Sequence, residues 1–293
     1  MILWVIRSAW IVLPVTSGDT IEAAISDWTG PSRSVAAGLL FASWAIGLLS
    51  LLSPRPRAFT ALRIVAPALA VFTCAAALQA SRPVDYLIAA LAVATCIATL
   101  SNTVADGCID AASYGNERRH PLRLPPQFSL VVVPATVVIV ISGISTGPML
   151  LANNRALFGA IATVIGLPVA WVGIRSLVSL ERRFVVLVPA GIVVSDALTL
   201  CDPVLFPTEH VIHIIRSTAI PTAQADAQDG VVDVRLGISG GLEVKMDEPG
   251  PFPCRAGRRQ TRTINADRLL FAPLRPTIVL DGWTSRARTR HSH

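Results

Sequence analysis

Apolar residues form long runs over residues 1–176, and this pattern predicts helices that cross a membrane. Residues 35–52 carry no charge, and such a run approaches the roughly 20 apolar residues that a helix needs to span a bilayer. Comparable runs follow along the chain, so we expect five spanning helices. Their expected ranges are 35–52, 64–80, 86–100, 129–144 and 157–172.

The first 34 residues are harder to assign to a span. Arg7 interrupts their apolar run and Pro14 follows it, so the run is shorter than a bilayer crossing. No small-residue cleavage pattern of a signal peptide follows a basic start. We therefore expect residues 1–34 to form interfacial or half-spanning helices, with a first helix ending at Pro14 and a second at residues 20–28. A short true span, the sixth, is the alternative.

Two of the apolar runs also contain small residues at the spacing of helix packing, namely Gly38 with Ala42 and Gly159 with Gly166. Small side chains let helix backbones approach closely in lipid.

The spans contain no charged residue or histidine, which argues against a proton-driven transporter or a cation channel. An accessory subunit of a transporter or secretion complex stays an option.

A polar stretch at residues 103–127 separates the third expected span from the fourth, and the arginines around it predict the orientation. Cytoplasmic loops are enriched in arginine and lysine. Three arginines follow the first, third and fifth expected spans, against one at each opposite end. The first set is Arg55, Arg57, Arg63, Arg118, Arg119, Arg123, Arg175, Arg182 and Arg183. We therefore expect a transmembrane domain at 35–176, with the loop 103–127 and the C-terminal region in the cytosol of a plasma-membrane protein.

From residue 177 onward the apolar pattern becomes that of β-strands. Residues 184–196 predict two strands around a turn at Pro189. Residues 231–247 alternate apolar and charged positions around a glycine-rich turn, which predicts a hairpin with one buried and one exposed face, Asp233 and Arg235 pointing outward. Pro276 suits the first turn of a closing helix. Further strands are expected at 203–215 and 262–271, and loops at 221–229 and 248–259.

Composition supports this division of the chain. Only 15% of the 293 residues are charged, against about 25% in soluble domains. The net charge of +6 fits contact with the lipid bilayer and its anionic headgroups, whereas no basic and aromatic motif for nucleic acid is present. The five cysteines lack paired spacing, so we expect no disulfide framework, metal site or cofactor.

The loop 103–127 carries the candidate chemistry. Two carboxylates and a histidine could act as acid, base or metal ligands on a lipid-linked substrate. The candidates are Asp106, Asp110, Glu117 and His120. No recognised catalytic motif accompanies them, and acids balanced by arginines are typical of a structural loop. We therefore expect no catalytic residue, and an enzyme acting on lipid-linked substrates is the alternative.

Docking is the role that this loop favours, either to the C-terminal domain or to an unidentified protein partner. The expected docking residues are Tyr114, Arg118, Arg119 and Arg123. Basic residues expected to face lipid are Arg182, Arg183, Arg286, Arg288 and Arg290. His210 and His213 lie three residues apart and would point to opposite faces of a strand, so they predict no metal site.

Residues 181–214 and 267–283, together with the loop segment SYGNERRHPLR at 113–123, resemble an uncharacterised family of multi-spanning membrane proteins from high-GC Gram-positive bacteria. That family's cytosolic domain is similar to the pleckstrin-homology (PH) type, a bent antiparallel sheet closed by a C-terminal helix. The resemblance implies a PH-like fold for residues 177–293 and carries over no catalytic residue. We therefore expect a membrane α-helical bundle followed by a small antiparallel β domain. Its expected role is a non-enzymatic interaction or scaffold subunit that binds a protein partner or the inner membrane surface.

Overall fold

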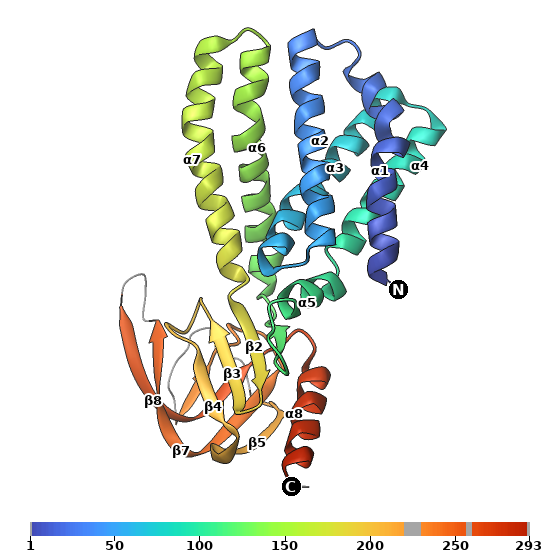
Figure 1. Ribbon diagram of the computed structural model, residues 1–293. Helices are drawn as coiled ribbons and strands as arrows, with labels where there is room; N and C mark the ends of the chain where they lie inside the picture. The colour runs from blue at the N-terminus through green and yellow to red at the C-terminus, as the bar shows by residue number, and fades with distance from the viewer. Residues whose placement is uncertain (1, 220–229, 256–259, 292–293) are drawn as a thin grey trace. The chain divides into compact units, whose positions relative to one another are not determined.

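The computed structural model describes residues 2–219, 230–255 and 260–291, and the chain divides into two compact units. The helical unit comprises Met1–Cys108 and Val133–Val178, and the β unit comprises Ile109–Val132 and Ser179–His293. Figure 1 follows the chain through both. The polar stretch between the third and fourth expected spans therefore contributes residues to each unit.

The helical unit is built from long apolar helices. They are α1 (Ile2–Ile25), α2 (Gly30–Leu52), α3 (Pro56–Ala80), α4 (Pro83–Thr99), α5 (Asn102–Asp110), α6 (Val133–Ala152) and α7 (Ala156–Leu180), with a π-helical turn (Phe128–Val132) leading into α6. Within the described residues, four helices are long and apolar enough to cross a membrane. The pair α4 and α5, bent by 45°, would make a fifth. The prediction of apolar spanning helices is confirmed at this level.

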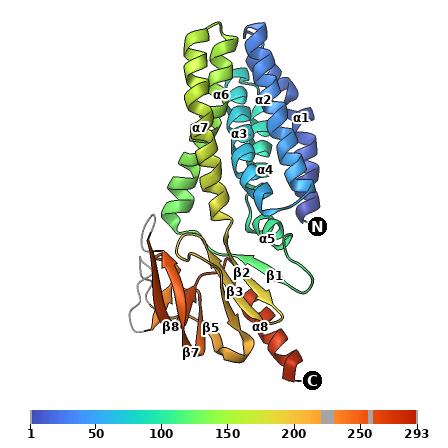
Figure 2. The same ribbon diagram turned by 60° about the vertical axis from the view of Figure 1, so that its left-hand side comes forward.

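Helix α1 departs from the prediction. Pro14 lies inside a continuous 24-residue helix instead of ending it, and residues 20–25 belong to the same helix. The reason is a single buried face, because side chains at positions 6, 10, 13, 17 and 20 are all buried and recur every three or four residues. Figure 2 shows α1 running beside α2, to which Trp10 is hydrogen-bonded.

Helices α6 and α7 pack through glycines. A methyl group on Gly143 would come within 2.6 Å of the Gly166 carbonyl oxygen, and one on Gly159 within 2.7 Å of Leu151. Close backbone approach of this kind is how small residues join helices in lipid, so the predicted packing role of Gly159 and Gly166 is confirmed. A methyl group on Gly38, in contrast, would meet no described atom within 4 Å.

The polar stretch 103–127 is not one loop. Its first part is helical in α5, because Val104, Ala105, Cys108 and Ile109 are buried on one helical face. Residues 118–121 form strand β1, which pairs with the C-terminal part of the chain. The prediction of a single connecting loop is therefore wrong at both places.

The β unit consists of two sheets. Its strands are β1 (Arg118–Pro121), β2 (Arg183–Val188), β3 (Gly191–Asp196), β4 (Val204–Pro207), β5 (Val211–Arg216), β6 (Val231–Asp233), β7 (Leu242–Arg255) and β8 (Thr261–Phe271), followed by helix α8 (Pro276–His291). Among the described strands the orders are β1-β2-β3-β4 and β5-β7-β8-β6, and the β6–β8 pair alone is parallel. A small β domain with a closing helix is therefore confirmed, although its second sheet is mixed.

Both sheets contribute to one core. Val185 and Phe206 from the first sheet, and Val244 and Leu269 from the second, are fully buried in the same cluster as Val279 of α8. Backbone contacts also join the sheets, since Leu200 bridges to Cys254. The predicted pair of strands around Pro189 is confirmed as β2 and β3.

The hairpin predicted at residues 231–247 is wrong. In the described part of the chain, β6 and β7 each pair with β8 and not with one another. The charged positions are buried, since Asp233 is 2% and Arg235 0% exposed. Arg235 donates to the two carboxylate oxygens of Asp233 at 2.9 and 2.7 Å, so both faces of this segment are inside. Strand β7 also includes residues 248–255, where a loop is predicted, and residues 221–229 and 256–259 lie outside the described residues.

Candidate functional site: the β1–α8 surface

Strand β1 places the polar stretch on the edge of the first sheet. It pairs antiparallel with β2, with His120 opposite Val185. Just after β1, the backbone N–H of Arg123 donates to the Ala272 carbonyl oxygen at 2.8 Å. The end of β1 is therefore held beside the chain that leads into α8.

Helix α8 contacts the other end of β1 as well. The Arg286 guanidinium, near the end of α8, donates to the carbonyl oxygen of Asn116, which precedes β1. A side chain of α8 therefore contacts the turn that precedes β1. We call the side chains on this contact the β1–α8 surface, which consists of Tyr114, Arg118, His120, Arg275 and Arg286.

Asp110 anchors the turn that precedes β1. Its carboxylate accepts hydrogen bonds from the Ser113 hydroxyl at 2.9 Å, the Arg118 guanidinium at 3.0 Å and the backbone N–H of Arg119 at 3.0 Å. Burial alone would raise the pKa of Asp110, but these donors outweigh it and hold the pKa below its usual value. A carboxylate kept ionised in this way is a structural anchor and a poor proton acceptor in catalysis.

Glu117 closes the same turn. Its backbone N–H donates to the Tyr114 carbonyl oxygen at 3.0 Å, while its carboxylate accepts the Tyr114 N–H at 3.5 Å and lies 3.6 Å from the Arg119 guanidinium. The turn leaves the Tyr114 side chain 82% exposed. A closed turn therefore presents an aromatic ring to solvent.

Positive charge dominates around His120. Burial lowers the pKa of His120; Asp110 raises it, and the arginines at 118, 286 and 275 lower it further. Burial and the charge of Arg118 also lower the pKa of Arg286. Among the described atoms, Nη1 of Arg286 is buried without a hydrogen-bond partner. The surface therefore favours an anionic or carbonyl-rich ligand and disfavours a protonated His120.

The four acid and base candidates belong to two different units. Asp106 is grouped with the helical unit, whereas Asp110 and Glu117 are engaged with arginines in the β unit. Among the described residues, the hydrogen-bond partners of the Asp110 and Glu117 carboxylates do not include His120. Beyond the effect of burial, Asp110 raises the pKa of His120, and three arginines lower it.

The remaining docking candidates have backbone or packing contacts. Arg119 points away from the β1–α8 surface, with its guanidinium 5.5 Å from the centre of the Phe184 ring. Arg123 is half-buried, and its carbonyl oxygen accepts a hydrogen bond from Arg183 at 3.1 Å. Among the predicted docking residues, Tyr114 and Arg118 are the two that project most into solvent.

Arg183 is not a lipid-facing residue, contrary to the prediction. Its side chain is 1% exposed, and two of its nitrogens donate to the two carboxylate oxygens of Asp196 at 2.9 Å each. A bidentate partner is what makes burial of an arginine tolerable. This ion pair could have been predicted from the register of the hairpin, because Arg183 and Asp196 lie opposite one another in the β2–β3 pair.

Other predicted basic residues differ in their surroundings. Arg182 is exposed, and Arg286 is half-buried against Asn116. The side chains of Arg288 and Arg290 lie outside the described part of the chain.

No group of three or more metal-ligating side chains occurs within the described residues.

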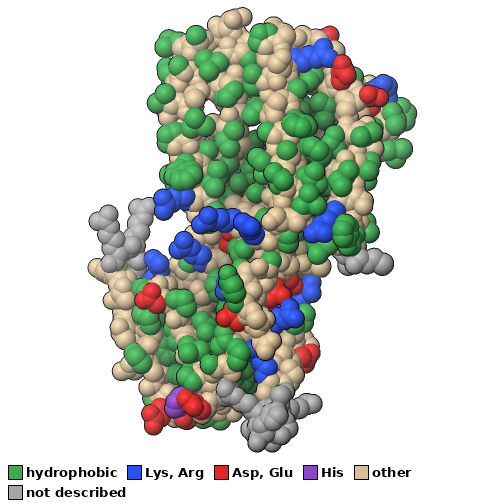
Figure 3. All heavy atoms as spheres, in the orientation of Figure 1, with side chains coloured by type: hydrophobic (Ala, Val, Ile, Leu, Met, Phe, Trp, Pro, Cys, Tyr) green, Lys and Arg blue, Asp and Glu red, His purple; other side chains and the backbone are tan. Residues whose placement is uncertain are grey.

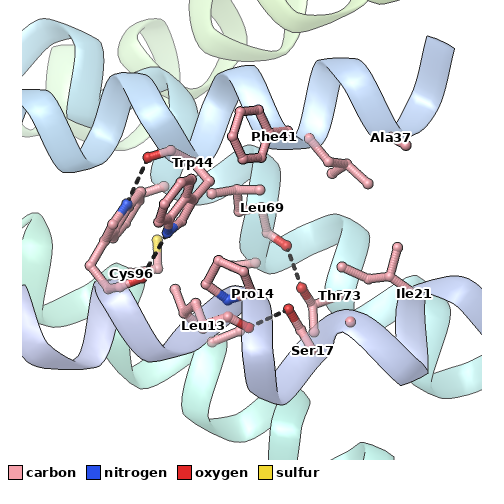
Figure 4. Close-up of a pocket in the computed structure, with 16 residues that line it drawn as sticks. Leu13, Pro14, Ser17, Ile21, Ala37, Phe41, Trp44, Leu69, Thr73 and Cys96 are labelled. Carbon is pink, nitrogen blue, oxygen red and sulfur yellow. Dashed lines mark hydrogen bonds between the residues drawn. The ribbon is translucent and has the colours of Figure 1, made fainter. Parts of the chain in front are cut away.

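The helical unit contains a pocket that the sequence did not indicate. It has a volume of about 200 Å³ and lies among α1, α2, α3 and α4. Figure 4 shows Phe41, Leu69 and Ile21 around it, with Trp44 at one side. Trp10 and Trp44 donate to each other's carbonyl oxygens at 2.9 Å. These bonds join α1 to α2, so the pocket belongs to the packing of the bundle.

Comparison with known proteins gives no template for this site. No family model, no curated protein and no solved structure matches the chain. The β1–α8 surface is therefore interpreted from its own geometry.

Proposed function

We propose that this protein is a non-enzymatic membrane scaffold whose β unit binds a protein partner through the β1–α8 surface. The observation that carries the proposal is Tyr114, which is 82% exposed on a closed turn. Tyrosine and arginine are enriched among the residues that supply most binding energy at protein interfaces. Arg118, with a side chain 68% exposed, stands in the same turn.

The charge of the surface indicates the chemistry of the partner. Three arginines of the β1–α8 surface act on His120, against one carboxylate, Asp110. An acidic segment with a recess for an aromatic ring complements such a surface. The alternative is that the surface binds the anionic inner face of the membrane. In that case binding would depend on the charge of the lipids, and no discrete protein partner would be found.

The apolar helices and the arginine distribution support the proposed membrane setting. The proposal places the protein in the plasma membrane with the β unit in the cytosol, because arginines are concentrated after the third and fifth expected spans, where the chain enters that unit. A reporter that is active only in the cytosol should work when fused after His293. Activity of a reporter that works only outside the membrane would contradict this orientation.

We extend the proposal to a PH-like fold for the β unit. Two sheets with one core, closed by a C-terminal helix that contributes Val279, support it. The PH type uses an antiparallel arrangement, whereas β6 pairs in parallel with β8. An experimental structure in which the two sheets do not share a core would contradict this fold.

The experiment that tests the docking role is site-specific photocrosslinking in cells from position 114. We expect a discrete crosslinked protein there, and none from position 205 on β4. The control position is also apolar and solvent-exposed, since Leu205 is 48% exposed in the same unit. Equal capture from both positions, or capture of lipid alone from position 114, would contradict a protein partner.

Variants sharpen that test. Tyr114→Ser should weaken recovery of the crosslinked partner strongly, since loss of an interface hot spot costs about 2 kcal/mol or more. Ile212→Ser, at a 57% exposed position on β5, should leave recovery unchanged.

The enzyme alternative is tested by alanine at positions 106, 110, 117 and 120. Accumulation of a lipid intermediate in cells carrying these variants would overturn the scaffold proposal.

A further inference from the structure

A larger cavity lies in the helical unit between the α6–α7 pair and the helices α2 and α3. Its volume is about 620 Å³. Its walls include Leu39 and Ser43 from α2, Ala61 and Ala68 from α3, and Ile144 from α6. On the face drawn in Figure 3, the helical unit is hollowed and pierced by small openings.

Small side chains explain why this space is not filled by protein. Positions 43, 61 and 68 carry serine or alanine where larger side chains would fill the gap. Helices α6 and α7 use their glycine faces for one another, so these faces do not close onto α2 and α3. Protein interiors are otherwise packed to the density of organic crystals, and an apolar space of this kind excludes water.

The α6–α7 pair is nevertheless attached to α2. The Ser32 hydroxyl donates to the side-chain oxygen of Asn153 at 2.9 Å, which joins the start of α2 to the α6–α7 connection. Helix α6 also contacts α3. The space is therefore a groove bounded by helices that contact one another, and a long, flexible chain fits it.

The two ends of the groove differ in chemistry. Arg57, at the start of α3, lines one end, and Trp28, just before α2, lines the other. From Arg57 to Phe72 the wall formed by α3 extends about 22 Å at roughly 1.5 Å per residue. That length exceeds one leaflet of a hydrocarbon core that is about 30 Å thick. A hydrocarbon chain with an anionic group at Arg57 complements this arrangement.

We propose that the groove binds one anionic phospholipid, with an acyl chain between α3 and α6 and its phosphate at Arg57. The site is independent of the docking role of the β unit, because it is formed wholly by the helical unit. The bound lipid fills the space that the small residues of α2 and α3 leave, and so completes the packing of the α6–α7 pair.

The test is native mass spectrometry of the purified full chain in micelles containing equal amounts of phosphatidylglycerol and phosphatidylcholine. We expect one retained phospholipid, with a preference for phosphatidylglycerol of about fivefold. That is the effect of one arginine on a headgroup of net negative charge, because the choline cation neutralises the phosphate of phosphatidylcholine. Arg57→Gln should abolish the preference. Arg55→Gln, an exposed arginine two residues away that does not line the groove, should preserve it.

Filling the groove provides a second arm. Ala68→Phe should lower total lipid retention by about tenfold or more, and Ala61→Phe serves as the second variant if the first does not fold. Ala94→Phe, the same change at an exposed position on α4 outside the groove, should have no effect. Absence of retained lipid in the unmodified chain would overturn the proposal. So would equal loss in Ala94→Phe, or occupancy by a second copy of the chain seen as a dimer that Ala68→Phe dissociates.

Discussion

The helical unit and the β unit distribute apolar and charged side chains in opposite ways. Large apolar residues of the helical unit face outward, for example Leu157 at 70% and Val164 at 72% exposure, and Figure 3 shows hydrophobic side chains spread over its surface. The β unit instead has an enclosed apolar core and buries Arg183 and Arg235 as well. Removing a charge should therefore be most costly in the β unit, while a change of shape matters most between the helices.

The largest effect is expected from breaking a buried ion pair of the β unit. Arg183→Ala leaves Asp196 buried without its bidentate partner, and loss of one partner of such a pair costs about 3–5 kcal/mol. The measurement is the free energy of opening of the β2 and β3 amides, obtained by hydrogen exchange on the full chain. Arg182→Ala, at the exposed neighbouring position, should change it by less than about 0.5 kcal/mol. Similar values for the two variants would contradict the buried pair.

A smaller effect is expected from adding a single methyl group between helices. In Gly47→Ala the new Cβ would come within 2.6 Å of Cε2 of Trp10, and overpacking of this kind costs about 1–3 kcal/mol. The unfolding temperature of the full chain in detergent should fall. Gly38→Ala lies on the same helix with no described atom within 4 Å of the added Cβ, and it should not lower that temperature. A fall with both would show that glycine itself, and not the tryptophan contact, is required.

Removing one hydrogen bond between α1 and α2 should have a still smaller effect. Trp44→Phe keeps an aromatic ring but removes the donor to the Trp10 carbonyl oxygen, at a cost of about 1 kcal/mol. Trp171→Phe changes a 62% exposed side chain and should leave the thermal unfolding curve unchanged. If Trp44→Phe unfolds at the same temperature as the unmodified chain, the reciprocal bonds do not stabilise the bundle.

The smallest effects concern pH, and they have opposite signs at two histidines of the β unit. The hydrogen bond from His210 to Asp247 raises the pKa of His210 above 6.5, whereas burial lowers that of His120 below 6.5. Stability from His210 is present below pH 6.5 and is lost as pH rises through its raised pKa. Stability linked to His120 is present above pH 6.5 and is lost as pH falls through its lowered pKa.

Titration by NMR of histidine ring carbons in the full chain would check these directions. The two midpoints should fall on opposite sides of 6.5, and Asp247→Asn should lower the His210 midpoint while leaving that of His120 unchanged. Midpoints on the same side would contradict the difference between the two environments.

The helical unit could be predicted largely from its sequence because a bilayer imposes one requirement on every span, a run of about 20 apolar residues. Helix α1 was not predicted correctly by this requirement, because its apolar run appeared too short. Its charged Arg7 donates to the Leu51 carbonyl oxygen at 3.0 Å, and Pro14 is tolerated within a helix that buries one whole face. A hydropathy pattern shows neither the Arg7 hydrogen bond nor the buried face of α1, because both depend on neighbouring helices.

The β unit was less predictable for a related reason. Alternation of apolar and charged positions indicates an exposed face only when the charged side chains reach water. Asp233 and Arg235 instead form a buried ion pair inside the β unit. The polar stretch was predicted as a connecting loop, and its pairing with β2 was not predicted. Strand β1 is four residues long, and its partner β2 lies far along the chain, beyond the reach of local pattern.

The separation of β1 from β2 has a consequence for biosynthesis. Roughly 60 residues lie between them, and at about 5–20 residues per second a ribosome needs on the order of 3–12 s to make them. During that interval β1 is without its partner while the helices α6 and α7 are being synthesised. The first sheet can therefore be completed only after both helices have been made, and a chain stalled before β2 would leave β1 as an unpaired strand.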